Sequence, residues 1–347
     1  MEFTTVWFVI IAVLWVGFFV LEGFDLGVGM LHGVLSRDEA SRRAVLHTIG
    51  PVWDGNEVWL VTAGAAMFAA FPGWYATLFS GFYLALVLLL AGLIVRGIAV
   101  EYRDRVDGAQ WRRTWTVLLT VGSLIVPFVL GIALGDLLHG VPVGRDQEYA
   151  GTFADLFTGY GVFTGITVTA LCLLHGATFL ALKTSGEIRE RAHRLARRAV
   201  LPVGLVVLAF VFWTRSLADQ GILLNLLELA AVLAVAAAAW AISSSHDGWA
   251  FGATTLAMAA TVGSLFTELY PRVMVSSISS AFDLTVDNTA SGPYALKVMT
   301  IVALVLLPVV LIYQGWTYHV FRKRISADHF PAPGQASPGP LTARPES

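Results

Sequence analysis

The chain has 347 residues, of which 56% are hydrophobic and only 13% are charged. Soluble domains average about 45–50% apolar and about 25% charged residues, so this chain has too few polar side chains to cover a water-soluble globule. The net charge of −2 excludes a nucleic-acid-binding footprint, and the single cysteine, Cys172, excludes an internal disulfide and a cysteine-built metal site. The composition therefore predicts a helical protein with several membrane spans.

Apolar stretches long enough to cross a membrane occur nine times along the chain. A spanning helix needs about 20 mostly apolar residues. Residues 1–325 are expected to form one transmembrane domain, and the Pro- and Gly-rich residues 326–347 a disordered cytoplasmic tail. The expected spans are 6–32, 52–71, 77–100, 115–138, 157–182, 199–214, 222–242, 249–270 and 296–321.

Basic residues alternate between the two sides of these spans. Most Lys and Arg residues lie in loops 34–50, 101–113 and 183–198 and directly after the last span. Because basic loops stay in the cytoplasm, this pattern predicts a cytoplasmic C-terminus and an N-terminus outside. We expect a multi-pass membrane protein.

Four carboxylates lie inside the first two expected spans. Glu22 and Asp25 are three residues apart, as are Asp54 and Glu57, so each pair shares a helix face. An ionisable group at membrane depth costs at least ~2.5–3.5 kcal/mol on insertion scales and indicates function. We expect a graded series of acids that leads inward from the cytoplasmic side and transfers protons. For Asp54, capping of the helix start remains a structural alternative.

Other polar residues in the spans have less specific interpretations. Arg96 is the expected counter-ion of the acids, with an arginine that extends to the membrane surface as the alternative. Asp136 and Glu268 lie at outer span ends and are expected to be solvated. His175 lies well inside a span, where we expect a hydrogen-bonded packing residue. A bis-histidine haem needs two ligands at similar depth, and the chain offers no obvious pair.

The residues around the acids resemble subunit II of the cytochrome bd quinol oxidases. The resemblance extends over about residues 6–325 and implies an all-α polytopic membrane protein, with about nine transmembrane helices in two four-helix bundles plus one peripheral helix. The motifs that carry it are residues 21–30 (LEGFDLGVGM), 50–60 (GPVWDGNEVWL), 68–72 (FAAFP) and 79–83 (FSGFY).

This resemblance implies a respiratory complex of the bacterial plasma membrane in which quinol is oxidised and oxygen is reduced to water. Subunit I would carry two haem b and one haem d together with the quinol site, and this chain would carry no haem. The complex would build proton motive force by taking its chemical protons from the cytoplasm. A small third subunit and a structural quinone in a lipid-facing groove are left open.

Site residues follow from the resemblance by position. Asp25 and Asp54 resemble acids on a proton route toward haem d, and Trp59 matches an aromatic residue on an oxygen path from the lipid. The roles of Glu22 and Glu57 stay open. Two alternatives remain: a proton-coupled secondary transporter, which buried acids also fit, and a purely structural assembly subunit.

Overall fold

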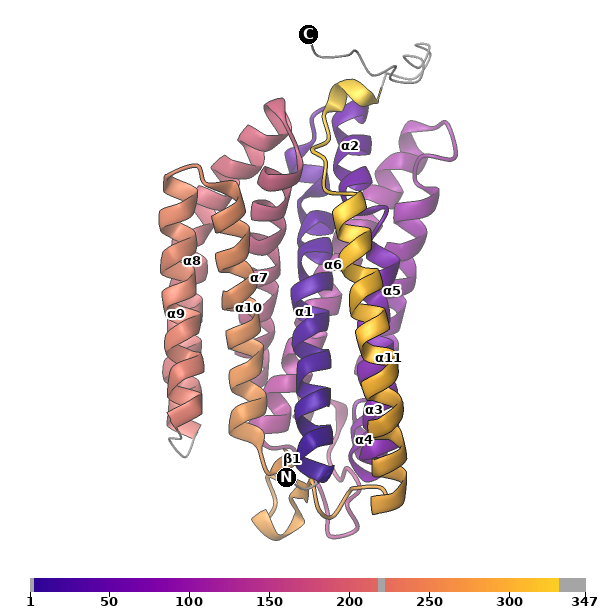
Figure 1. Ribbon diagram of the computed structural model, residues 1–347, viewed down its shortest axis with the longest axis vertical. Helices are drawn as coiled ribbons and strands as arrows, with labels where there is room; N and C mark the ends of the chain where they lie inside the picture. The colour runs from indigo at the N-terminus through magenta and orange to yellow at the C-terminus, as the bar shows by residue number, and fades with distance from the viewer. Residues whose placement is uncertain (1–2, 218–221, 331–347) are drawn as a thin grey trace.

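Helices make up most of the chain in this computed structural model, which describes residues 3–217 and 222–330 (Figure 1). Two short strands and three short 3₁₀ turns lie in the connections. The elements in chain order are α1 (Phe3–Leu35), α2 (Glu39–Ile49), α3 (Trp53–Ala70), α4 (Pro72–Gly81), α5 (Tyr83–Tyr102), α6 (Ala109–His139), η1 (Phe153–Leu156), α7 (Gly159–Lys183), α8 (Gly186–Leu217), α9 (Ile222–Ser243), α10 (Asp247–Leu269), β1 (Arg272–Met274), η2 (Ser280–Phe282), β2 (Leu284–Thr285), α11 (Pro293–Val320) and η3 (Ala327–His329).

Within the described ranges, eight helices are long and apolar enough to cross a membrane: α1 and α5 to α11 without a gap. The remaining expected span, 52–71, forms α3, an 18-residue helix with a polar first turn that does not join the eight. The expected span 77–100 is wrong as a single helix. Its first residues belong to α4, and the chain leaves helical geometry at Phe82 (ψ 15°) before α5 begins. Two expected loops also contain helix, namely α2 and the start of α8.

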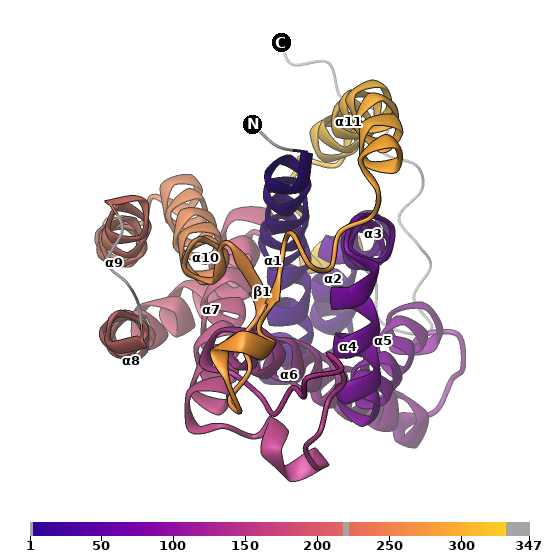
Figure 2. The ribbon, with the colours of Figure 1, turned by 90° about the horizontal axis from the view of Figure 1, so that it is seen from below.

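The helices form two four-helix bundles and one peripheral helix. The first bundle consists of α1, α3, α5 and α6, and the second of α7 to α10. The two bundles meet where α1 and α6 pack on α7. Helix α11 lies outside the first bundle against α1 and α3, as the view from below shows (Figure 2). This arrangement confirms the expected fold class.

Glycines let the central helices approach closely. A Cβ atom on Gly27 of α1 would lie 2.0 Å from the carbonyl oxygen of Cys172 on α7, and one on Gly176 would lie 2.4 Å from the backbone of Gly27. Gly29 is equally close to Ser123 of α6. Because lipid supplies no hydrophobic drive between helices, such close backbone packing is a main source of their association.

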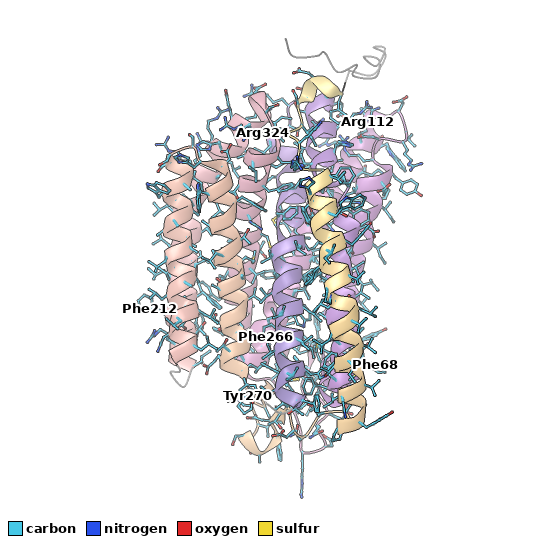
Figure 3. The ribbon with its side chains drawn as sticks, viewed as in Figure 1. Phe68, Arg112, Phe212, Phe266, Tyr270 and Arg324 are labelled. Carbon is cyan, nitrogen blue, oxygen red and sulfur yellow. The ribbon has the colours of Figure 1, made fainter. Side chains whose placement is uncertain are left out.

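The end of the molecule that carries α2 is basic, and the chain returns to it after α11. Figure 3 shows Arg112 and Arg324 at this end and Tyr270 toward the opposite end. The Ile325 N–H donates to the Lys183 carbonyl (2.8 Å), and the Phe330 ring packs on His47. The described chain therefore continues five residues past 325, and the rest of the expected tail, 331–347, lies outside the described residues.

At the opposite end, the loops hold the junction between α3 and α4. Ser291 donates through its N–H to the Ala70 carbonyl (2.9 Å) and through its hydroxyl to the Ala69 carbonyl (2.7 Å). The Thr77 hydroxyl donates to the Gln147 carbonyl (2.7 Å). Strands β1 and β2 pair antiparallel in the loop that precedes α11.

Candidate functional site

A buried group of charged side chains lies among α1, α3 and α5. Arg96 on α5 places Nη1 2.5 Å from Oε1 of Glu22 on α1, and neither side chain is exposed. The same nitrogen lies 3.9 Å from Oε2 of Glu57 on α3, a side chain that is 21% exposed. Arg96 is thus the counter-ion of Glu22 in this structure and does not extend to the membrane surface.

Asn56 is the junction between the acids and the peripheral helix. Its side chain is fully buried, and Nδ2 donates to Oδ2 of Asp25 (2.7 Å) and to the Leu21 carbonyl (3.2 Å). Its Oδ1 accepts from Nε2 of Gln314 (3.0 Å) and from the hydroxyl of Tyr318 (2.8 Å), both on α11. This role was not expected from the sequence, although an asparagine inside an expected span is itself a signal.

Charge is unbalanced in this group. Glu22 and Glu57 lie within 4 Å of one guanidinium, that of Arg96, and Asp25 interacts with the same guanidinium electrostatically. Oε2 of Glu22, Oδ1 of Asp25, and Nε and Nη2 of Arg96 have no hydrogen-bond partner among the described residues. An uncompensated buried charge costs several kcal/mol, so carboxyls in such a place take up a proton or hydrogen-bond to water. The arrangement can therefore bind and release protons.

Asp54 lies at the exposed edge of this group, next to Glu57. Its side chain is exposed on α3, and α3 begins after Val52 without a side-chain cap, so Asp54 does not cap the helix. Exposure falls from Asp54 to the partly exposed Glu57 and then to the fully buried Glu22. Trp59, half-buried on the same helix, lies directly over Gly17 of α1.

Acids at the opposite end of the bundles are also buried. The expectation that Asp136 and Glu268 are solvated is wrong, because they are 0% and 7% exposed. Thr158, at the start of α7, covers the end of α6 and donates its hydroxyl to Asp136 Oδ1 (2.5 Å). Glu228 of α9 is also buried and lies 3.3 Å from Nη1 of Arg215 on α8. These acids are part of the second bundle and of its contact with α6.

His175 does not fit a haem ligand. Its Nε2 donates to the Val20 carbonyl (3.1 Å), Nδ1 lies 2.8 Å from the Thr254 hydroxyl, and the ring stacks on Phe251. Both ring nitrogens are thus engaged, which confirms a hydrogen-bonded packing role. Residues 3–217 and 222–330 contain no group of three or more side chains suited to a metal ion. The engaged nitrogens leave the His175 ring no free position for an iron atom.

A known sequence family covers nearly all of the chain. The sequence model described as cytochrome bd terminal oxidase subunit II matches residues 3–321. The chain belongs to the cytochrome bd terminal oxidase subunit II family. Within it, cytochrome bd ubiquinol oxidase subunit 2 of Bacillus subtilis (strain 168) is 46% identical over 324 residues, which cover 92% of this chain and 96% of that relative.

More distant members of the cytochrome bd family agree. Cytochrome bd-I ubiquinol oxidase subunit 2 of Escherichia coli (strain K12) is 34% identical over 363 residues, covering 93% of this chain and 95% of that protein. The structure of bd oxidase from Geobacillus thermodenitrificans shares the fold, with a TM-score of 0.71 at 19% identity over 93% of this chain and 100% of that chain.

Family membership confirms the resemblance inferred from the motifs. This cytochrome bd subunit II is a multi-pass protein of the bacterial plasma membrane and a subunit of a terminal oxidase. The transporter alternative is thereby set aside. The complex in which such a subunit works contains haem.

Proposed function

We propose that this chain is the haem-free subunit II of a quinol:oxygen oxidoreductase and that its buried acids pass protons toward the site of oxygen reduction. Haem bound in subunit I supplies the electron transfer to oxygen. The names of the relatives support the enzyme class, and the engaged nitrogens of His175 support the absence of a haem ligand at that position. Two haem b and one haem d in subunit I, a small third subunit and a structural quinone belong to the same proposal.

One observation carries the proton role, namely three acids that share a single buried guanidinium. Arg96 compensates one negative charge at Glu22, so further negative charge in the group is unpaired and favours bound protons. Because Asp54 is exposed and Glu57 partly exposed, protons can enter at α3 and move to Glu22 and Asp25. A proton relay needs this gradient from solvent access to burial.

The proposal is tested by removing the exchangeable proton while keeping the side-chain shape. Asp25→Asn and Glu22→Gln are expected to lower oxygen consumption per assembled haem d by about tenfold or more, because positioned proton transfer contributes about 10²–10⁴-fold in enzymes. Asp54→Asn is expected to lower it less, since water can replace a group at an exposed entrance. Asp107→Asn is the matched control, because Asp107 is 92% exposed and pairs with Arg112, which is not part of the group.

Two results would contradict the relay. Full activity in both Asp25→Asn and Glu22→Gln would leave it without support. Loss of the haem d absorbance in proportion to activity would show that these acids serve assembly. That outcome corresponds to the purely structural subunit.

Trp59 supports a separate part of the proposal, the supply of oxygen. Its half-buried ring closes over Gly17 at the seam between α1 and α3, where an apolar route from the lipid can pass. Trp59→Phe replaces the two fused rings of the indole with a single, smaller aromatic ring. A route past this ring is supported if the variant changes the KM for oxygen while the maximal rate stays constant.

A further inference from the structure

A groove of about 430 Å³ opens at the α2 end of the molecule, between the end of α1 and the facing sides of α7 and α8. Four arginines line it, together with an apolar wall that includes Leu173 of α7 and Leu195 of α8. The arginines are Arg37, Arg191, Arg194 and Arg198.

The arginines are only partly compensated by acids. Arg191 is 9% exposed, donates to the Leu35 carbonyl (2.9 Å) and is paired with Glu187, which also lies 3.6 Å from Arg37. Arg194 lies 3.6 Å from Glu190 on its own helix.

Arg198 is exposed and has no ion-pair partner in the part of the chain that the structure describes. With Glu187, Glu190 and Asp38, which interacts electrostatically with Arg191, counted against the four arginines, the groove keeps an excess of one positive charge. This excess favours an anionic ligand over a neutral one.

The same face of α8 becomes apolar directly beyond the arginines. Arg194 and Arg198 are four residues apart and so share one side of the helix. Leu201 and Leu205 follow at helical spacing and are 70% and 59% exposed. Since α8 is long and apolar enough to cross a membrane, the charged groove continues into an exposed apolar surface of a candidate membrane helix.

We propose that this groove binds the phosphate headgroup of an anionic phospholipid, whose acyl chains lie along α7 and α8. Guanidinium groups pair with phosphate oxygens through two parallel hydrogen bonds, and basic pockets between membrane helices are typical sites for anionic headgroups. The apolar surface beyond Arg198 is what a lipid requires and a free phosphate ion does not. The site would fix a lipid at the seam between the two bundles.

The test measures lipid bound to the purified whole oxidase, by native mass spectrometry with added dioleoyl phosphatidylglycerol. Arg198→Gln is expected to weaken binding about fivefold, and Arg194→Gln with Arg198→Gln about 25-fold, because each basic residue near a lipid headgroup contributes ~1 kcal/mol. The matched control is Arg197→Gln, which removes an exposed arginine of the same helix that does not line the groove. Unchanged haem absorbance shows that the variants assemble.

Three results would overturn the proposal. Equal loss in Arg197→Gln and Arg198→Gln would show diffuse attraction to basic residues without a site. Equal binding of dioleoyl phosphatidylcholine would show that the groove does not select negative charge. Displacement of the lipid by millimolar inorganic phosphate would show a free-phosphate site, whereas retention together with the Arg198→Gln loss supports the lipid.

Discussion

Replacement of Arg96 by methionine removes the buried cation that faces Glu22 and Glu57. The Arg96–Glu22 contact is 2.5 Å long, and both side chains are shielded from solvent, so Glu22 would stay buried without its counter-ion. Breaking a buried pair from one side costs about 3–5 kcal/mol. Arg96→Met is therefore expected to lower the free energy of unfolding by about that amount.

A second variant separates the ion pair from the loss of packing. Arg96→Met combined with Glu22→Gln leaves neither charge of the pair and is expected to recover most of the lost free energy. The measurement is equilibrium unfolding of the purified oxidase in mixed micelles titrated with dodecyl sulfate. Arg112→Met is the control, because its partner Asp107 is exposed and stays hydrated, so a far smaller change is expected. Two results would contradict this expectation. One is an equal free energy of unfolding for Arg96→Met and the wild type, and the other is a double variant no more stable than Arg96→Met.

Three further outcomes are expected. Gly27→Ala places a Cβ 2.0 Å from the α7 backbone and should reduce the yield of assembled complex, whereas Gly252→Ala, with nothing within 4 Å, should not; equal yields would refute this packing argument. The backbone N–H and hydroxyl of Ser41 donate to Asp38 and hold its pKa below the usual value. Hydrogen-exchange protection of α2 should therefore be full above about pH 4 and decline below it. The same pH profile in Asp38→Ala would refute the cap. Arg43→Cys should react with an impermeant thiol reagent only after cells are opened, and labelling from outside would reverse the orientation.

Local patterns in the sequence were sufficient to predict the helices and the first pair of acids. Long apolar runs are required for crossing a membrane, and a spacing of three residues places Glu22 and Asp25 on one helix face whatever the neighbours are. Ends of helices were less predictable, because α8 begins thirteen residues before the expected span, in a segment too polar to be recognised by hydropathy.

Rotation of a helix about its own axis was not predictable from local spacing. Asp54 and Glu57 do share a side of α3, but Asn56 is the residue turned toward Asp25. Contacts from distant segments set that rotation, including Gln314 of α11, which follows Asn56 by 258 residues. Sequence spacing along one helix carries no information about such partners.

The same distance has a consequence for biosynthesis. Asn56 Oδ1 receives its donors from Gln314 and Tyr318, which are synthesised 258 and 262 residues later. At about 5–20 residues per second, roughly 13–50 s pass between the emergence of Asn56 and that of its partners. During this interval the buried Asn56 side chain on α3 lacks both of its hydrogen-bond donors from α11. The nascent chain therefore completes the carboxylate site only when α11 arrives, after all the helices that form the two bundles have been synthesised.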